Sequence, residues 1–212
     1  CLELMANRRK GHALDLGCAV GRASFELARG GFARVTGLDF STRFFRLAAR
    51  MQEEGYLRYA FPEEGEVVSF HEVGLKELGL EEVRERVQFY QADACNIPEK
   101  FGGFDLVLAA NLLDRLYSPR RFLATIHHHM NRGGLLVITS PYSWSEEFTR
   151  KEEWLGGYRE AGEPVWTLDG LKAALSERFR MVGEPRDIPF VIRETRRKFQ
   201  HSIAEVTAWE LQ

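Results

Sequence analysis

The chain has 212 residues, of which 44% are hydrophobic and 28% are charged, and its formal net charge is −2. This length predicts a single globular domain, residues 1–212, with a complete hydrophobic core. The near-neutral charge gives no reason to expect nucleic acid or an anionic membrane as a partner. No apolar run approaches the roughly 20 residues of a membrane-spanning helix and no signal peptide is visible, so we expect a cytoplasmic protein.

The cysteines and histidines indicate neither a disulfide framework nor a metal site. Three cysteines stand apart at positions 1, 18 and 95, a pattern typical of reduced thiols in the cytoplasm. His127, His128 and His129 are consecutive, and successive helical residues point about 100° apart, so they cannot converge on one ion. We expect His129 to pack in the core, its two neighbours to be solvated, and no metal in this domain.

The first predicted elements are a short helix over residues 1–10, an apolar strand that ends in Asp15, and a helix over residues 20–29. Between strand and helix lies a turn of small residues within the segment ALDLGCAVG, residues 13–21. Such a turn lets a ligand lie against bare backbone, with amide N–H groups and the positive end of the helix facing it. The segment therefore predicts a nucleotide-type ligand site.

The spacing of the turn selects among such ligands. A dinucleotide fingerprint needs G-x-G-x-x-G, but counting from Gly17 the second and third positions hold Ala19 and Arg22, and no Walker A lysine is present. The segment fits instead the acidic-x-G-x-x-x-G pattern of S-adenosylmethionine (SAM) enzymes, with Asp15 as the acidic residue. The alternative is an ordinary tight strand-to-helix turn in another α/β protein.

Two further carboxylates follow later strands in the order that a SAM site requires. Residues 33–39 form a β-branched and apolar strand ending in Asp39, eighteen positions after Gly21, where a carboxylate can accept both ribose hydroxyls. Residues 87–94 form a third strand followed by Asp93, which can accept the adenine amino hydrogens. A single aspartate at a strand end is usually a loop cap, but three on successive strands favour the SAM interpretation.

The segment between the second helix and the third strand is longer than a simple crossover needs. Ser41 is a plausible N-cap for a helix that ends at about Gln52, and an insertion at about 55–86 follows it. Within the insertion, residues 67–73 read as a strand and residues 79–86 as a short helix. The sequence leaves open whether the insertion forms a lid, a dimer contact or a decoration.

The second half continues the alternation of strands and helices. Continuous apolar residues predict strands at 104–110 and 135–140, with a helix between them that starts at Ser118-Pro119 and carries Phe122, Leu123, Ile126 and Met130 inward. A helix near 167–178 and extended stretches at about 181–193 and 201–211 complete the chain. The expected fold is α/β: a doubly wound, seven-stranded, mostly parallel sheet of the Rossmann-like class I SAM-dependent methyltransferase type, with an antiparallel last strand.

Ligands of an open α/β sheet bind at the carboxyl ends of its strands, which defines the candidate cofactor residues. They are Asp15, Gly17, Cys18, Ala19, Gly21, Arg22, Asp39, Phe40, Ser41, Asp93, Ala94, Ala110 and Asn111. Backbone carbonyls at Ala109 or Ala110 could hold the SAM amino group, while Asn111 and Asp114 point at the methyl acceptor. The segment Asn111-Leu112-Leu113-Asp114 lacks the proline-rich element of enzymes that methylate exocyclic or amide nitrogen, which argues against that class.

Five segments together resemble the ovothiol-pathway methyltransferases, a family of 5-thiohistidine π-N-methyltransferases often fused C-terminally to an iron-dependent sulfoxide synthase. They are GCAVGRASFELA, GLDFS, QADACNIP, NLLDRL and the C-terminal IPFVIRETRRKFQHSIAEVTAWE. The resemblance covers essentially the whole chain. It implies methylation of the imidazole π-nitrogen of 5-thiohistidine to give ovothiol A and S-adenosylhomocysteine, and a fusion or functional pairing with such a synthase. The 212 residues contain no such synthase domain, so we expect either a stand-alone enzyme or an excised domain.

That substrate suggests roles for residues in two regions, at about 141–166 and 186–202. The amino acid's carboxylate would pair with Arg193 or Arg196, because bidentate clamping suits that group, and its ammonium with Asp114 or Glu194. Tyr142 could hydrogen-bond the ring or take a proton. The candidate catalytic residues are Asn111, Asp114 and Tyr142, and the candidate substrate residues are Asp114, Tyr142, Trp144, Phe190, Arg193, Glu194 and Arg196.

Three other functions remain open on the sequence alone. The chain could be another small-molecule N- or O-methyltransferase, or a SAM-binding module without catalysis. A nicotinamide oxidoreductase is disfavoured by the glycine spacing.

Overall fold

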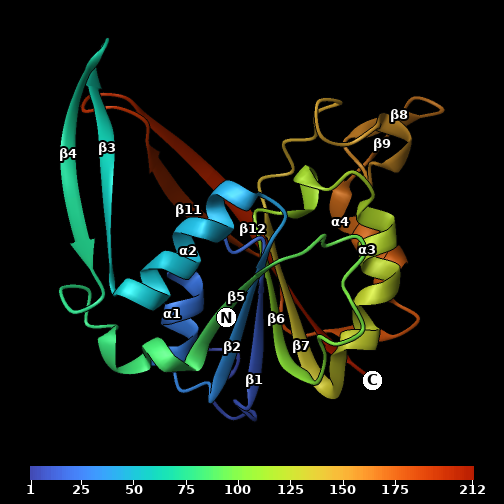
Figure 1. Cartoon of the computed structure of the whole chain (residues 1–212). Coiled ribbons are helices and arrows are strands. Elements are labelled where there is room, and N and C mark those ends of the chain that lie inside the picture. Colours follow the sequence, from blue (N-terminus) through green and yellow to red (C-terminus); the bar gives the residue numbers. More distant parts are fainter.

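A computed structural model describes all 212 residues, and a single large sheet organises them (Figure 1). The strands lie in the order β10-β12-β7-β6-β1-β2-β5, and β11 also pairs with β12. Their bounds are β1 His12–Leu16, β2 Arg34–Asp39, β5 Val87–Gln91, β6 Phe104–Ala110, β7 Met130–Ser140, β10 Phe179–Met181, β11 Arg186–Arg193 and β12 Phe199–Leu211.

The topology confirms the predicted doubly wound sheet. Strands β5, β2, β1, β6 and β7 are parallel, whereas β12 runs antiparallel to β7. The stretch expected as one strand at about 181–193 is split into β10 and β11, which pair with different parts of β12, so the sheet has eight strands rather than seven. The chain order reverses between β1 and β6, which is the point where ligands bind in such sheets.

Two helices cover each face of the sheet (Figure 1). Helices α1 (Arg22–Arg29) and α2 (Thr42–Glu54) lie on one face, and α3 (Pro119–Thr125) and α4 (Thr167–Leu175) on the other. In α1 the buried Phe25 and Ala28 are three residues apart, the spacing that keeps apolar side chains on one helical face. The core accordingly forms two apolar clusters, one around Phe25 and one around Phe122.

The insertion forms a hairpin that stands apart from the main sheet. Strands β3 (Tyr56–Glu64) and β4 (Val67–Gly74) pair only with each other, and the 3-10 helix η1 (Glu81–Arg86) leads into β5. The predicted strand at 67–73 and short helix at 79–86 are confirmed. Strand β3 is additional, because its pattern of exposed and half-buried residues carries little apolar signal.

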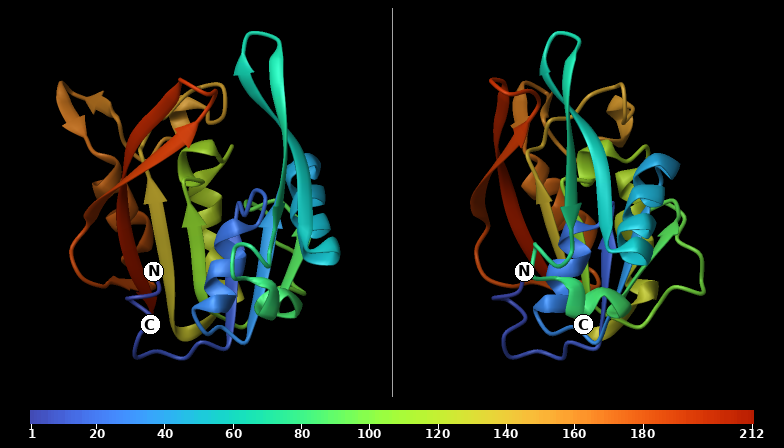
Figure 2. Two further views of the ribbon diagram at one scale, coloured as in Figure 1. Left: turned by 90° about the vertical axis from the view of Figure 1, so that its left-hand side faces the viewer. Right: turned by 60° about the vertical axis from the view of Figure 1, so that its left-hand side comes forward.

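Three hairpins project past the carboxyl ends of the parallel strands (Figure 2). They are β3–β4, β11–β12 and the short pair β8 (Tyr158–Glu160) with β9 (Glu163–Val165). The remaining 3-10 helices are η2 (Leu113–Arg115), η3 (Ile126–His129) and η4 (Lys151–Glu153). The hairpins therefore surround the end of the sheet at which the candidate cofactor residues lie.

Some local predictions are wrong. Residues 1–10 form consecutive turns rather than a helix, and Met5, only 1% exposed, anchors them in the core. Met130 is buried as expected, but it begins β7 instead of ending a helix, because the chain extends directly after His129. Helix α4 ends at Leu175, three residues before its expected end. No helix combines the length and the apolarity needed to cross a membrane.

Candidate active site

The turn between β1 and α1 is built from backbone held in the left-handed region. Gly17 and Gly21 have φ of 75° and 86°, and a side chain at Gly21 would collide with the Phe89 ring. The N–H groups of Gly17 and Cys18 donate to the Leu38 carbonyl oxygen at 2.8 and 3.1 Å. The turn is thus fastened to the end of β2.

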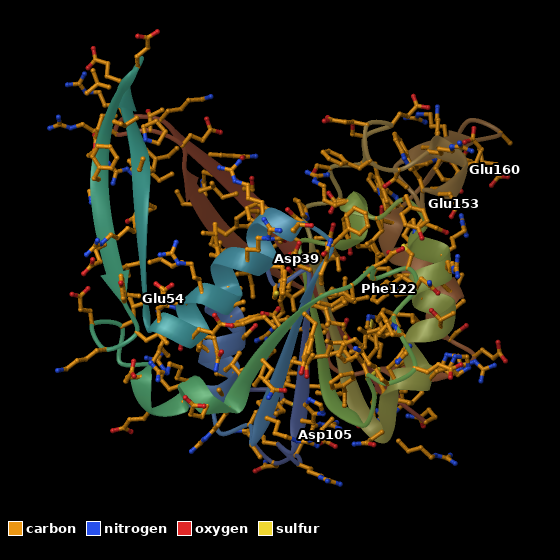
Figure 3. All side chains as sticks on the ribbon, viewed as in Figure 1. Asp39, Glu54, Asp105, Phe122, Glu153 and Glu160 are labelled. Atoms are coloured by element: carbon orange, nitrogen blue, oxygen red, sulfur yellow. The ribbon has the colours of Figure 1, made fainter.

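Asp39 joins this turn to the start of α2. Its Oδ2 accepts the N–H of Ala19 and its Oδ1 the N–H of Ser41, both at 2.8 Å, while the residue remains 9% exposed. Ser41 occupies the expected N-cap position, but its side chain makes no capping hydrogen bond. Figure 3 places Asp39 at the upper end of the sheet and Asp105 at the opposite end, so the candidate cofactor residues gather where the topology requires.

A cavity of about 280 Å³ opens beside Asp39. Five stretches line it: the end of β1, the end of β2, the loop after β5, the segment around η2, and the loop after β7. The lining residues are Leu16, Gly17, Leu38, Asp39, Phe40, Ala92, Asp93, Ala94, Leu112, Arg115, Leu116, Tyr117, Glu147 and Phe148. The structure therefore brings together five of the predicted cofactor residues, namely Gly17, Asp39, Phe40, Asp93 and Ala94, in one concave site.

The Asp93 carboxylate accepts hydrogen bonds from a backbone N–H and from a tyrosine that lines the cavity. Its Oδ1 accepts the N–H of Cys95 and its Oδ2 accepts the Tyr117 hydroxyl, both at 2.8 Å. The hydrogen bond to Asp93 raises the pKa of Tyr117 to about 12. Tyr117 and Arg115 lie in the NLLDRLYSP segment, and sequence reasoning missed both as cavity residues.

Asp15 lies beneath the turn instead of facing the cavity. The residue is 2% exposed, and its Oδ2 accepts the Ser24 hydroxyl at 2.6 Å. Burial raises its pKa to about 6, against the opposing effect of the Ser24 hydrogen bond. Cys18, in the turn above, is also buried, and Arg22 on α1 is exposed and paired with Glu26.

The residues just after β6 and β7 have strained backbone conformations. Asn111 after β6 and Tyr142 after β7 have φ of 53° and 52°, and Ala19 in the glycine turn has 47°. Residues without a glycine's freedom adopt such angles at a cost, and they concentrate at functional sites. Asn111 is exposed, with its N–H donated to the Thr139 carbonyl oxygen at 2.8 Å, and Ala110 before it is half-buried.

Asp114 does not face an open site, contrary to expectation. Its side chain is 1% exposed. It accepts the hydroxyl of Ser140 at 3.0 Å, the N–H and hydroxyl of Ser143 at 3.0 and 2.8 Å, and the Arg115 guanidinium at 3.1 Å. Three of these hydrogen bonds go to Oδ2 and one to Oδ1, so the carboxylate holds the loop after β7 in place. Its burial and its pairing with Arg115 leave it inaccessible to a substrate ammonium.

Tyr142 and Trp144 are also tied into the protein. The Tyr142 hydroxyl donates to Oε2 of Glu205 at 2.7 Å, and burial together with this carboxylate raises its pKa. The phenol therefore stays protonated, which disfavours the expected role as a proton acceptor. The Trp144 indole donates to Thr167 at 2.9 Å and stacks on Trp154 with ring centroids 6.1 Å apart, so it supports the loop.

The expected substrate residues of the C-terminal hairpin do not meet Asn111. Phe190 is half-buried on β11, and the Arg193 guanidinium lies 4.5 Å from the centroid of the Phe61 ring on β3. Glu194 pairs with Lys198 at 2.5 Å, and Arg196 is exposed with no polar partner. Arg193 pairs with Phe199, six residues or about 20 Å along β12 from Glu205.

The histidine tract behaves largely as expected. His129 is buried, with its Nδ1 2.6 Å from the Phe101 carbonyl oxygen, and His128 is exposed. His127 is less solvated than expected, since its Nδ1 is buried without a partner. No three His, Cys, Asp or Glu side chains are grouped as metal ligands would be.

Solved structures with this architecture include SAM-dependent methyltransferases. A SAM-dependent methyltransferase of Methanosarcina mazei is 19% identical, with a TM-score of 0.62 over 99% of this chain and 96% of that one. A structure from work on the conversion of a disulfide bond into a thioacetal group during echinomycin biosynthesis is 17% identical (TM-score 0.64; 100% and 80% covered). A [4+2]-cyclase is 23% identical (TM-score 0.54; 88% and 59% covered). A search of curated proteins finds no match.

The sheet order, the glycine turn and the carboxylates around the cavity define a Rossmann-like class I SAM-dependent methyltransferase. A family model described as a methyltransferase domain matches residues 14–138, which is more than half of the chain. The chain belongs to this methyltransferase domain family.

Proposed function

We propose that this methyltransferase transfers a methyl group from SAM to the imidazole π-nitrogen of 5-thiohistidine, giving ovothiol A and S-adenosylhomocysteine. The observation that carries the proposal is the position of the segment IPFVIRETRRKFQHSIAEVTAWE. It forms most of the β11–β12 hairpin, which rises beside the strand ends where a methyl acceptor must lie (Figure 2). The segment in which the chain resembles ovothiol-pathway enzymes most specifically is thus a wall of the candidate substrate space.

The residues around the cavity suit the parts of SAM. Asp39 would accept the ribose hydroxyls, because each of its oxygens has spent only one lone pair on a backbone N–H. Asp93 would accept the adenine amino group, and the N–H of Ala94 would face a ring nitrogen. The carbonyl groups at Ala109 or Ala110 would accept the ammonium of the methionine part. Bound SAM supplies an electrophilic methyl group.

The protein's contribution to the transfer is to position the acceptor and exclude water. In-line displacement at a sulfonium gains most of its acceleration from these two effects. Asn111, exposed at the end of β6, lies where it can orient the acceptor. A dedicated base is needed only for an acceptor nitrogen that is still protonated, and the raised pKa of Tyr142 makes that phenol unsuited to the task.

The substrate poses a problem of regiochemistry. The thiolate of 5-thiohistidine is a softer and stronger nucleophile than its ring nitrogen, so free reaction with a sulfonium should occur at sulfur. We infer that the site selects nitrogen by geometry, holding the π-nitrogen in line with the methyl group and the sulfur off that axis.

Another small-molecule N- or O-methyltransferase is the alternative function, and a SAM-binding module without catalysis is a weaker alternative.

To test the proposed function, the native protein is incubated with SAM and 5-thiohistidine, with histidine as the matched control acceptor, and the products are analysed by mass spectrometry. We expect a singly methylated product whose fragmentation places the methyl group on nitrogen, together with S-adenosylhomocysteine. Methylation on sulfur would refute the regiochemistry, and no product would refute the substrate.

A fusion to, or functional pairing with, an iron-dependent sulfoxide synthase is part of the same proposal. The synthase reaction would supply the thiohistidine that this site consumes. A pull-down with a synthase of the corresponding class should recover the two proteins together if they pair without fusion.

A further inference from the structure

Glu205 is a charged residue near the start of the mostly buried half of β12. It lies in β12 between Ala204 and Val206, which are 2% and 6% exposed, and is itself half-buried. No lysine, arginine or histidine comes within 4.0 Å of its carboxylate, although Glu210 on the same strand pairs with Arg180 at 3.1 Å. A partly desolvated carboxylate without a cation is costly, so its retention points to a partner that the chain itself does not supply.

One oxygen of this carboxylate is fixed and the other is free. Oε2 accepts the Tyr142 hydroxyl at 2.7 Å, whereas Oε1 has no hydrogen-bond partner. Tyr142 in turn is held by its own N–H, which donates to the Ser140 hydroxyl at 3.0 Å. The strained backbone at Tyr142 therefore serves to aim a phenol at Glu205.

Glu205 lies at the same edge of the sheet as the acceptor position. It is in register with Ser140, the last residue of β7, and the neighbouring Thr139 is in register with Ala110 of β6. Two strand spacings, or about 10 Å, therefore separate Glu205 from the end of β6. The charges near it are negative: Asp187 is its cross-strand neighbour on β11, and Asp114 lies on the β7 side, its charge contributing to the raised pKa of Tyr142.

The other carboxylates expected to bind a substrate ammonium are engaged. Asp114 is enclosed by four donors and Glu194 is paired with Lys198. Of the three carboxylates, Asp114 is paired with Arg115 and Glu194 with Lys198, whereas Glu205 has no cation of the protein within 4.0 Å.

We propose that Glu205 binds the α-ammonium group of the amino acid acceptor, with Tyr142 as the residue that positions its carboxylate. This inference rests on the proposed function, because it takes the acceptor to be an amino acid with the reactive ring at one end and the ammonium at the other. Glu205 then sets specificity for an α-amino acid, while Asn111 and the strand ends position the ring.

The test compares Glu205→Gln with the native enzyme on two acceptors. These are 5-thiohistidine and its des-amino analogue, the 5-thioimidazole propionate that lacks the ammonium. Loss of a charge-assisted hydrogen bond should raise the KM for 5-thiohistidine on the order of tenfold to a hundredfold. The KM for the des-amino analogue should be the same in both enzymes, and kcat should change little.

Two further variants separate binding from structure. Asp187→Asn, at the exposed cross-strand neighbour, should leave both KM values unchanged. Tyr142→Phe, which frees Glu205 without removing its charge, should raise the KM for 5-thiohistidine less than Glu205→Gln does, again without effect on the analogue.

An equal rise in KM for both acceptors in Glu205→Gln, or no rise for either, would overturn the assignment of Glu205. Native enzyme that methylates neither acceptor would overturn the proposed function and this inference with it. The two failures are therefore distinguishable.

Discussion

Asp15 occupies the acidic position of the glycine-turn motif, yet its chemistry is that of the core. Its carboxylate is buried under the turn and bonded to Ser24, so its raised pKa reflects desolvation. The aspartates that line the cavity are Asp39 and Asp93. The motif thus identifies the turn that borders the cavity, but its acidic residue is buried beneath that turn and does not line the cavity.

We predict that Asp15 makes the stability of the protein depend on pH. Its pKa is about 6 when folded and near 3.8 when unfolded, so between these values the folded state holds a proton that the unfolded state has released. The free energy of unfolding should therefore fall as pH rises from about 4 to 6, by at most about 3 kcal/mol from this residue, and then level off. Urea denaturation at a series of pH values measures it.

Asp15→Asn is the matched variant for this prediction, since an amide oxygen can still accept the Ser24 hydroxyl. The difference in unfolding free energy between the variant and the native protein should grow in favour of the variant from pH 4 to 6. A difference independent of pH would show that Asp15 titrates normally.

At the scale of elements, the two long hairpins touch at their outer ends. The Arg193 guanidinium lies over the Phe61 ring, and Arg197 is 3.7 Å from Glu64, so β11–β12 and β3–β4 brace each other. These contacts involve none of the cavity residues. The insertion therefore contacts the C-terminal hairpin and not the residues that line the cavity.

We predict that Arg193→Ala weakens binding of the methyl acceptor and leaves binding of SAM unchanged. Loss of a cation–π contact worth about 0.5–1 kcal/mol loosens the wall of the substrate space, so the KM for 5-thiohistidine should rise several-fold. The Kd for SAM, measured by calorimetry, should stay within about twofold. Arg196→Ala, on the same turn but without a partner, is the control. Equal loss of SAM affinity would mean that Arg193 supports the whole fold.

The elements that the sequence predicted well are those with a strong period or a distinctive turn. Apolar runs such as residues 104–110 and the glycine turn leave few alternatives, so the central strands and the turn before α1 could be located. Strand β3 and the turns at residues 1–10 were missed because their patterns are mixed and their conformation depends on distant contacts.

The substrate side was harder to predict because side-chain partners decide it. Asp114 and Tyr142 have the right chemistry in the sequence, but the fold engages Asp114 with Ser143 and Tyr142 with Glu205. One signal was available for Glu205: a carboxylate between the apolar residues Ala204 and Val206 of β12. Only the register of β12 against β7 shows that this carboxylate lies at the working edge of the sheet.

At the scale of the whole molecule, the fold indicates the class of reaction but does not identify the substrate. The fold of this chain is similar to the folds of a SAM-dependent methyltransferase and of a [4+2]-cyclase. Function therefore depends on the residues that surround the site and not on the fold alone. In this chain three hairpins rise from the carboxyl edge of the sheet, and we expect them to carry such residues (Figure 2).

The most direct test is a crystal structure of the protein with S-adenosylhomocysteine. We predict that the nucleoside lies in the cavity between β2 and η2, with both ribose hydroxyls on the Asp39 carboxylate and the adenine beside Asp93 and Ala94. A nucleoside bound elsewhere, or an Asp39 side chain turned away from the ribose, would contradict it.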